Sequence, residues 1–436
     1  MKSLSRIFLM ALVAIAFTLT SAASAQYTEK VLFNIQGGAY GTSPEAFVRD
    51  ATGNIYGVFL AGGNSTCSTT CGLVYKLSPN GSGQMIETIL HTFTGGADGS
   101  QPRNILMDAN GNLFVSAWTG GTASCLDGCG AIVELSPIKS GGWKTTVLFD
   151  FGGSSSGGGG VHPILTLIDA QGNLYGHEDG DHYGHVFELS RSSSGTWTHK
   201  VIYRFLGGSD GGAGYPSFID ANGNIFGRAL ESASGACPGG CGLIFELSPG
   251  SSGTWTKTNT YTFAGTPDGG YPFALVPDGN GNMFGVTIEG GSGTNSICVQ
   301  INGCGTLFEL SPSSGGGYTE TVLHDFNNVL DGYSPATLAG DNAGNLYVAP
   351  GGGGVAGGGV ALEFTLGSDG IWEYTTLHSF GGGRGGNNPS LILLDSSNDV
   401  FGLAFGGSKY GVVFELSPTA GHAARRVTLP DSVSNE

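Results

Sequence analysis

The chain has 436 residues, and its 17 Lys and Arg against 34 Asp and Glu give a formal net charge of −17 at pH 7. This balance argues against nucleic acid or an anionic membrane surface as the partner, because both are bound through basic patches. Glycine accounts for 80 residues without the period of collagen, and aromatic and β-branched runs recur between the glycines, which predicts many tight turns between short strands.

The first 25 residues have the features of a secretory signal peptide. Lys2 and Arg6 make a basic start, residues 7–19 are apolar, and a small-residue A-S-A cleavage signal ends at Ala25. The apolar run is too short for a stable transmembrane helix, and no later stretch is long and apolar enough to span a bilayer. We therefore expect residues 1–25 to be removed and the mature protein to be secreted, in the periplasm or outside the cell.

The segment behind the leader, YTEKVLFNI (27–35), is one of four strand types that recur in a fixed order. In one copy of the unit, a short apolar run after Pro (type A, 102–108) precedes a Gly-Asn phrase that opens a second strand (type B, 111–117). A Gly-rich segment, a strand ending in L-S-P (type C, 131–137) and an aromatic strand (type D, 143–151) complete the unit. Each run is bounded by Gly, Asn, Asp or Pro, as expected of β-strands.

The unit recurs seven times, and its D-x-x-G-N phrase begins at Asp50, Asp108, Asp169, Asp220, Asp278, Asp341 and, in degenerate form, Asp395. Seven four-stranded antiparallel units predict an all-β fold, a seven-bladed β-propeller over residues 26–418. Only six type D strands follow residue 36, and the last unit ends with a type C strand at 411–418. We therefore expect strand 27–35 to pair with 411–418 and close the ring, which removes two unpaired sheet edges. An open β-solenoid is the alternative, and residues 419–436 are expected to form a disordered tail.

The phrase D-x-x-G-N-L-Y-G, followed by G-x-V-F-E/K-L and then L-x-x-F-x-G-G-x-D-G-x-x-P, resembles the GloVer-type tandem repeat of secreted bacterial "choice-of-anchor" proteins. The resemblance covers residues 27–418 and rests on several phrases that recur in order. It implies export and a repeat architecture, and it carries no catalytic residue that could be transferred to this chain. Members of the family often end in an anchoring segment, but the tail 419–436 contains no apolar stretch of that kind.

Eight cysteines form four close pairs in the B–C segments of units one, two, four and five. The pairs are Cys67/Cys71, Cys125/Cys129, Cys237/Cys241 and Cys298/Cys304. The other three units lack both members, as expected if each pair is bonded within its own loop. In an exported chain such a bond is a disulfide. Zinc binding is the alternative, but it would require two pairs to converge on one tetrahedral site.

Unit three carries a His- and Asp-rich segment, GHEDGDHYGH (176–185), in place of the cysteine loop. Imidazole and carboxylate groups suit Zn²⁺ or another divalent cation. A solvated polar loop is the interpretation that we favour, and the divalent-cation site is its alternative. The candidate metal ligands are His177, Asp179, Asp181, His182 and His185.

A second acidic set lies in the D–A loops and comprises Asp98, Asp210, Asp268 and Asp331. These residues precede Gly and are expected to be turn residues on a possible ligand-binding face, with bound Ca²⁺ as the alternative. The Asp of each Gly-Asn phrase also predicts a hairpin turn, because the phrase lacks the later acidic ligand of an EF-hand loop. His91, His324 and His378 share a D-strand position with Phe and Tyr of other units, which indicates a packing role.

In every predicted blade the A–B and C–D turns share one face, and the B–C and D–A loops share the other. The second face collects the most variable loops, where a rigid scaffold carries recognition. The sequence therefore favours a monomeric binding scaffold for a protein or glycan partner, or for a cation such as Ca²⁺ or Zn²⁺, with no other cofactor expected. A propeller-type glycoside hydrolase or polysaccharide lyase is the alternative, which requires two carboxylates flanking a cleft or a metal site. A structural surface-layer role is the third hypothesis.

Overall fold

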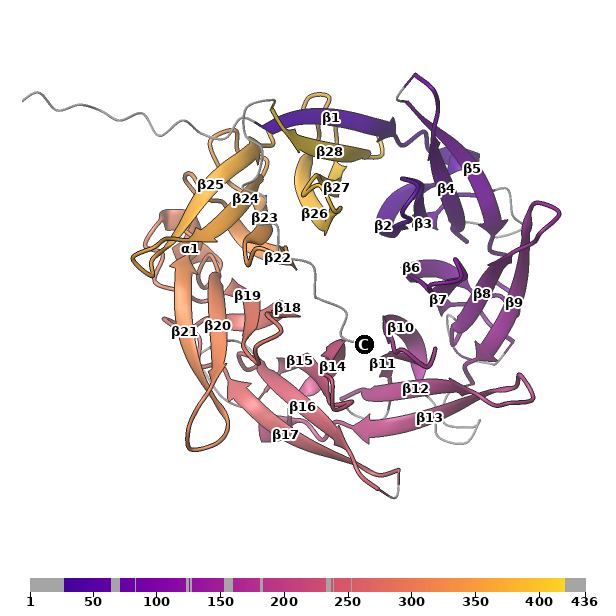
Figure 1. The fold of residues 1–436 in the computed structure, drawn as a ribbon, viewed down its shortest axis with the longest axis horizontal. Coiled ribbons are helices and arrows are strands. Elements are labelled where there is room, and N and C mark those ends of the chain that lie inside the picture. Colours follow the sequence, from indigo (N-terminus) through magenta and orange to yellow (C-terminus); the bar gives the residue numbers. More distant parts are fainter. Residues whose placement is uncertain are drawn as a thin grey trace, which may run out of the picture.

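The computed structural model describes residues 27–419, apart from 64–70, 83, 123–124, 126–127, 153–159, 181–182, 233–236, 238 and 252. The described residues form a ring of seven four-stranded antiparallel sheets, so the predicted seven-bladed propeller is confirmed (Figure 1). In each blade the A strand lies nearest the ring axis and the D strand lies outermost.

Six blades follow the chain in the order A, B, C, D. Blade one contains β2 (Thr42–Arg49), β3 (Ile55–Ala61), β4 (Leu73–Pro79) and β5 (Met85–Thr92), and blade two contains β6 (Ser100–Met107), β7 (Leu113–Thr119), β8 (Ala131–Pro137) and β9 (Trp143–Asp150). Blade three contains β10 (Val161–Ile168), β11 (Leu174–Asp179), β12 (His185–Arg191) and β13 (Trp197–Arg204), and blade four contains β14 (Gly212–Ile219), β15 (Ile225–Glu231), β16 (Leu243–Pro249) and β17 (Trp255–Thr262). Blade five contains β18 (Gly270–Pro277), β19 (Met283–Glu289), β20 (Thr306–Pro312) and β21 (Tyr318–Asp325), and blade six contains β22 (Tyr333–Gly340), β23 (Leu346–Gly352), β24 (Val360–Leu366) and β25 (Trp372–Ser379).

Blade seven joins the two ends of the described chain. It contains β26 (Asn387–Leu394), β27 (Val400–Phe405) and β28 (Val412–Pro418), and its outermost strand is β1 (Tyr27–Asn34). The strands β1 and β28 pair antiparallel from Tyr27 opposite Pro418 to Asn34 opposite Val412, with one irregularity in the register. The predicted closure of the ring is therefore confirmed, and Leu32 and Ile35 are buried in the core between blades seven and one.

The loops contain little helix. The only α-helix in the described part of the chain is α1 (Ser296–Gln300), in the B–C loop of blade five, and two 3₁₀ turns, η1 (Gly38–Tyr40) and η3 (Gly208–Asp210), lie in D–A loops. No helix among the described residues is long and apolar enough to cross a membrane.

Each A–B turn is closed by its aspartate, as predicted. In blade one, the Asp50 carboxylate accepts hydrogen bonds from the backbone N–H groups of Thr52 and Asn54, both over 2.9 Å, and from the Asn54 side chain over 2.8 Å. The same pattern recurs at Asp108, Asp169, Asp220, Asp278 and Asp341. Since the carboxylates satisfy their own turns, the repeated Asp-Gly-Asn phrase specifies hairpins.

The B and C strands of a blade are matched by size at one pair of facing residues. In five blades a B-strand glycine faces a C-strand aromatic ring, in the pairs Gly57–Tyr75, Gly176–Phe187, Gly227–Phe245, Gly285–Phe308 and Gly402–Phe414. In the other two the pair is aliphatic, Val115–Val133 and Val348–Leu362. A Cβ atom added at Gly285 would overlap the ring of Phe308, so the glycine is needed for the space it leaves. The repeat therefore permits a large residue on one strand only if its partner is small.

This matching predicts the outcome of a double substitution in blade five. We expect Gly285→Val alone to destabilise the protein by about 1–3 kcal/mol, because overpacking a dense core forces side chains from their preferred rotamers. The double variant Gly285→Val/Phe308→Leu reproduces the blade-six pair and should recover part of that loss, which urea unfolding would measure. A double variant that loses the full sum of the two single effects would contradict the size match.

Candidate functional site

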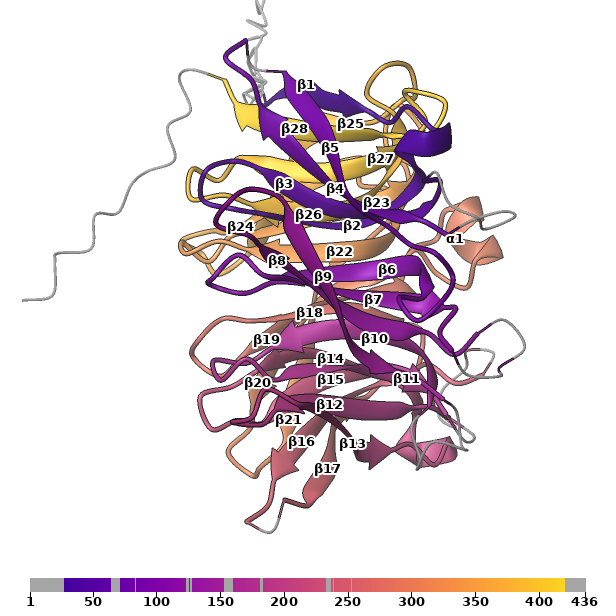
Figure 2. The same cartoon turned by 90° about the vertical axis from the view of Figure 1, so that its right-hand side faces the viewer.

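The two faces of the ring carry different connections. The A–B and C–D turns lie on one face, which we call the hairpin face, and the B–C and D–A loops lie on the other, which we call the loop-bearing face (Figure 2). The helix α1 lies on the loop-bearing face (Figure 2), and the turns η1 and η3 belong to D–A loops of the same face. Variation in loop structure is therefore concentrated on one side of the molecule.

The B–C loops carry disulfides, as predicted. Disulfides join Cys125 to Cys129, Cys237 to Cys241 and Cys298 to Cys304, with Cα atoms 5.4, 5.0 and 4.7 Å apart. Cys71 is also disulfide-bonded, and Cys67 lies outside the described residues. The second cysteine of each pair also contacts the next blade. Its backbone carbonyl accepts a hydrogen bond of 2.8 to 2.9 Å from the backbone N–H group of Gln101, His162, Tyr271 or Ser334. Each disulfide loop is thus fixed to its neighbouring blade.

The residues that make these contacts belong to a ring of strained backbone positions. At the start of every A strand, one non-glycine residue has φ between 49° and 57°, in the left-handed region. These residues are Ser43, Gln101, His162, Ala213, Tyr271, Ser334 and Asn388. Such a conformation costs L-residues roughly 1–2 kcal/mol each, and strain of this kind is often held at functional sites. In this protein the strained residues lie at the starts of the innermost strands, next to the loop-bearing face.

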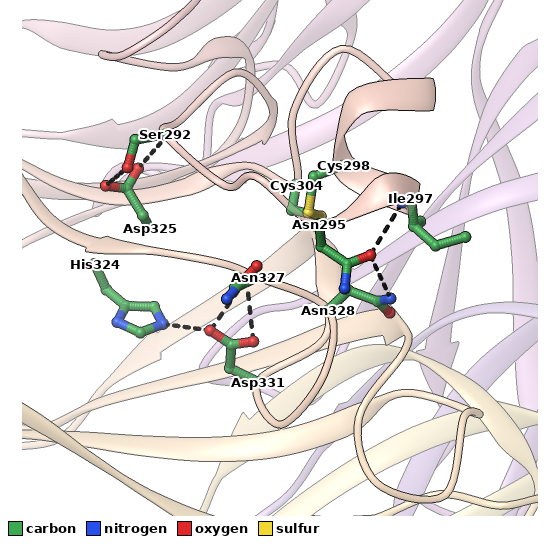
Figure 3. Close-up of a disulfide and its surroundings, with 10 residues drawn as sticks. All are labelled: Ser292, Asn295, Ile297, Cys298, Cys304, His324, Asp325, Asn327, Asn328 and Asp331. Atoms are coloured by element: carbon green, nitrogen blue, oxygen red, sulfur yellow. Dashed lines mark hydrogen bonds and ion pairs between the residues drawn. A yellow bond between two sulfur atoms is a disulfide. The ribbon is translucent and has the colours of Figure 1, made fainter.

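The aspartates of the D–A loops close their own loops. The Asp331 carboxylate accepts a hydrogen bond of 3.1 Å from the Asn327 N–H and lies 2.9 Å from His324 Nε2 (Figure 3). Asp98 lies 3.0 Å from His91 Nε2, and Asp210 and Asp268 accept hydrogen bonds from the hydroxyls of Tyr203 and Tyr261. The predicted turn role is confirmed, and the D-strand His or Tyr that shares one position in the repeat holds the loop aspartate seven residues later.

In the His- and Asp-rich segment of blade three, residues 176–179 and 185 lie in strands, where the sequence indicated a loop. His177, Glu178 and Asp179 end β11, and His185 begins β12. Successive side chains of a strand point to opposite faces, so Glu178 lies on one face of the blade and its two neighbours lie on the other. The predicted ligands Asp181 and His182 lie outside the described residues. Among the residues that the structure describes, no three or more His, Cys, Asp or Glu are placed to hold a metal ion, and the divalent-cation site in this segment stays a prediction.

Glu178 is the centre of a buried ionic network. Its fully buried carboxylate lies 3.2 Å from His185 Nδ1 and 2.8 Å from His199 Nε2. It also accepts a hydrogen bond of 2.8 Å from the backbone N–H group of Gly160. Arg204 lies 2.8 Å from His185 Nε2 and extends the network. Burial alone would raise the pKa of Glu178, but the hydrogen bonds from His185, His199 and Gly160 outweigh it and hold the pKa below its ordinary value. The network joins β11, β12 and β13 in a blade that lacks a disulfide.

On the other face of β11, a series of contacts runs along the seams between blades. Asp179 is 53% exposed, and its carboxylate lies 3.0 Å from His162 Nδ1 and 3.3 Å from His177 Nε2. His162 stacks on Trp118 and His177 packs against Tyr215, in both cases with ring centroids 4.4 Å apart. Burial opposes ionisation of Asp179, but the hydrogen bonds from both histidines hold its pKa well below the usual range.

Two arginines continue these contacts in both directions. Arg103 lies over the Trp118 ring, 4.9 Å from its centroid, and pairs with Glu45 at 3.2 Å. The guanidinium carbon of Arg228 lies 5.1 Å from the ring centroid of Tyr215 and 5.0 Å from that of Phe273. We call the whole set the inner rim cluster. It comprises Glu45, Arg103, Trp118, His162, His177, Asp179, Tyr215, Arg228 and Phe273, and it extends over blades one to five.

The loop-bearing face is hollowed between blades five and six. A groove of about 620 Å³ is lined by Ile297, Asn328, Val329, Leu330, Tyr333, Gly353, Gly354, Val355 and Gly357. We call it the apolar groove, because Val329, Leu330 and Val355 are 54%, 55% and 77% exposed. A second hollow of about 430 Å³ lies beside it and includes Val299, which is 70% exposed on α1. Four large aliphatic side chains thus lie in solvent on neighbouring loops.

The polar side chains between neighbouring D strands find a partner in some blades and lack one among the described residues in others. At the third D-strand position, Lys257 contacts Asp210 at 3.1 Å and His199 contacts Glu178. At the same position, Glu87 and Glu320 each have a buried carboxyl oxygen without a hydrogen-bond partner among the described residues. Burial raises the pKa of both carboxyl groups to about 7.

The inner rim cluster was largely missed by sequence reasoning. His177 and Asp179 were singled out, but His162, Trp118 and Arg228 were not. A signal was present at one B-strand position, which holds His177 in blade three and Arg228 in blade four. The other blades carry Val58, Ser116, Val286, Ala349 and Leu403 there.

The fold defines the protein as a seven-bladed β-propeller assembled from a tandem repeat, with its B–C and D–A loops on one face. The chain belongs to the Gloeobacter/Verrucomicrobia repeat family, whose profile matches residues 43–299. The resemblance inferred from the repeated phrases is therefore confirmed. Among curated proteins, none matches the chain.

Solved structures of several proteins align with the chain. A protein from Lactobacillus plantarum aligns with a TM-score of 0.52 at 13% identity, over 83% of this chain and 98% of its own. An aldose sugar dehydrogenase from Streptomyces coelicolor, in its PQQ-bound form, aligns with a TM-score of 0.42 at 11% identity, over 90% and 98%. A gluconolactonase from Xanthomonas campestris aligns with a TM-score of 0.40 at 14% identity, over 74% and 88%. At these identities the likeness concerns the fold alone.

The buried network predicts a large effect of one substitution. We expect Glu178→Ala to lower the free energy of unfolding by about 3–5 kcal/mol, because it leaves the N–H groups of His185, His199 and Gly160 without their acceptor in a buried site. The control Asp179→Ala removes the next residue of the same strand, which is half exposed, and should cost about 1 kcal/mol or less. Equal losses in urea unfolding would contradict the central role of Glu178.

The two seam carboxyls predict a dependence of stability on pH. Their pKa of about 7 in the folded protein exceeds the ordinary value of 4.5, so the folded state holds more protons between these values and stability should fall as pH rises through that window. Glu87→Gln/Glu320→Gln should be more stable than the parent at pH 8 by up to about 1 kcal/mol per site, since both groups remain partly solvated. The difference should vanish at pH 4.5, and the exposed Glu373→Gln should show none; a pH-independent difference would refute the assignment.

Proposed function

We propose that the protein is an exported binding module that docks a protein partner on its loop-bearing face. The observation that carries the proposal is the apolar groove and the exposed aliphatic side chains around it. Monomeric proteins rarely expose apolar side chains in contiguous groups, and such groups are typical of interaction sites. The leader at 1–25 and the disulfides support an extracellular or periplasmic location.

The loops that form the groove are held in place before any partner binds. The Asn295 side chain accepts a hydrogen bond of 3.0 Å from the Ile297 N–H and one of 3.4 Å from the Asn328 side chain (Figure 3). The Cys298–Cys304 disulfide closes the same loop around α1. A loop already fixed in its binding conformation loses less entropy on association, which favours affinity.

The chemistry of the groove favours a protein over a glycan or a cation. Glycans are bound by aromatic platforms and polar groups, whereas this groove offers Val329, Leu330 and Val355, with Tyr333 as its aromatic side chain. A fully buried Val or Leu contributes about 1.5–3 kcal/mol, so covering these residues supplies several kcal/mol. A cation has less support, because the D–A loop aspartates are engaged within their own loops.

One observation favours a second candidate, a propeller-type glycoside hydrolase or polysaccharide lyase. His162 is held by Asp179 through Nδ1 and stacks on Trp118, and it is 24% exposed. A carboxylate that orients an imidazole is the arrangement of many general bases. In this candidate His162 removes a proton from a sugar, and Trp118 stacks against the substrate.

The binding proposal predicts that two charged substitutions abolish docking. The probe is a mixed array of proteins and glycans, screened with the labelled mature chain, and each hit is then measured by biolayer interferometry. We expect protein hits whose affinity falls at least tenfold in Leu330→Asp/Val355→Asp, because a carboxylate would then be desolvated in the interface.

The matched control is Leu366→Asp, which changes a 57% exposed leucine at a C–D turn of the hairpin face and should leave affinity unchanged. An array with no protein hit, or equal losses in both variants, would count against the proposal. Turnover of a polysaccharide that His162→Ala abolishes would establish the enzyme instead.

A further inference from the structure

Arg228 places a charge where the repeat does not require one. It lies at the B-strand position of β15 that faces the next blade, and the equivalent residues of five blades are uncharged: Val58, Ser116, Val286, Ala349 and Leu403. All five are fully buried. An arginine at such a position costs desolvation energy that an aliphatic residue would not.

The guanidinium of Arg228 has no counter-charge in the described part of the chain. Arg49 and Arg103 pair with Asp395 and Glu45 at 3.1 and 3.2 Å, whereas Arg228 forms no ion pair with any residue that the structure describes. Its Nε is buried and has no hydrogen-bond partner among the described residues. The residues of its own B–C loop that lie outside the description, 233–236 and 238, include no Asp or Glu.

Two aromatic rings hold this cation in place. Tyr215 comes from β14 and Phe273 from β18, the innermost strands of blades four and five, and the guanidinium carbon lies 5.1 and 5.0 Å from their centroids. Cation–π contacts of this kind contribute about 0.5–2 kcal/mol each, but an aromatic ring provides no oxygen acceptor for the guanidinium N–H groups. Burial lowers the pKa of Arg228 to about 10, so the group stays charged at neutral pH. Phe273 is 37% exposed and offers a flat apolar surface beside the charge.

We infer that Arg228, Tyr215 and Phe273 form a binding site for a carboxylate carried next to an apolar or sugar ring face. A carboxylate matches the guanidinium fork with two parallel hydrogen bonds. The ring of Phe273 then packs against the carbon skeleton of the ligand. A uronic acid and the C-terminus of a peptide share this chemistry. The site contains no residue of the apolar groove, so it can fail while the docking proposal stands, and the reverse.

The test uses the mature chain and isothermal titration with four probes: glucuronate, its neutral isostere glucuronamide, N-acetylalanine and N-acetylalanine amide. We expect at least one carboxylate to bind at least tenfold more tightly than its amide. Tighter binding of glucuronate would assign a sugar acid, and tighter binding of N-acetylalanine would assign a peptide C-terminus. Amides that bind as tightly as the acids, or no binding by any probe up to 50 mM (about 1.8 kcal/mol), would overturn the inference.

Variants separate this site from general charge effects. Arg228→Met keeps a long side chain among the aromatic rings and should abolish the preference for the acid, and Arg228→Lys should weaken it severalfold because the fork is lost. The matched control is Arg49→Met, which removes an arginine that lies over Phe401 at 4.3 Å but is already paired with Asp395. If Arg228→Met fails to fold, Arg228→Lys still decides the question, because unchanged affinity in that variant contradicts bidentate binding.

Discussion

The pairing of β1 with β28 is the interaction on which the rest of the structure depends. Each blade has two apolar faces, and a blade can bury both only when it has a neighbour on either side. Leu32 and Ile35 of the first segment pack with Phe401, Leu403 and Val413 of the last blade and with the core of blade one. Without that contact, blades one and seven would each expose a face, and the positions of all the loops around the ring would no longer be fixed.

Within the closed ring, the polar and charged side chains that could bind a ligand or react lie between neighbouring blades. The repeat fixes the turns, the Gly–aromatic pairs and the strand order, and these elements are nearly the same in every blade. The side chains between two blades have to fit only those two blades. Substitutions at one such contact can therefore occur without disturbing the contacts between other blades. Glu178 with its histidines, the His162–Asp179 pair and Arg228 are such local departures. The candidate sites therefore lie where the repeat is broken.

The sequence was sufficient to predict the fold because each strand carries its own signal and the signals repeat. The spare D strand at 27–35 predicted the closure, and the absence of both cysteines from three units predicted the disulfide pairing. The site was predicted only in part, since His177 and Asp179 were expected to lie in a loop with His185. The strand β11 extends through Asp179, and the alternation of its side chains places His177 and Asp179 on the opposite face from Glu178, which contacts His185 instead. Contacts between blades, such as His162 on Trp118 or Arg228 on Phe273, depend on side chains more than 40 residues apart, and no local pattern encodes them.

Ring closure also sets an order of events for every newly made chain. A ribosome makes β1 first and β28 last, and their contact at Lys30 and Glu415 spans 385 residues. During that interval the first strand has no partner within its own molecule. Any second copy that has completed β28 can offer the same register, so exchange of β1 between nascent molecules competes with closure. The feature that makes the finished ring compact thus makes its assembly sensitive to crowding by identical chains.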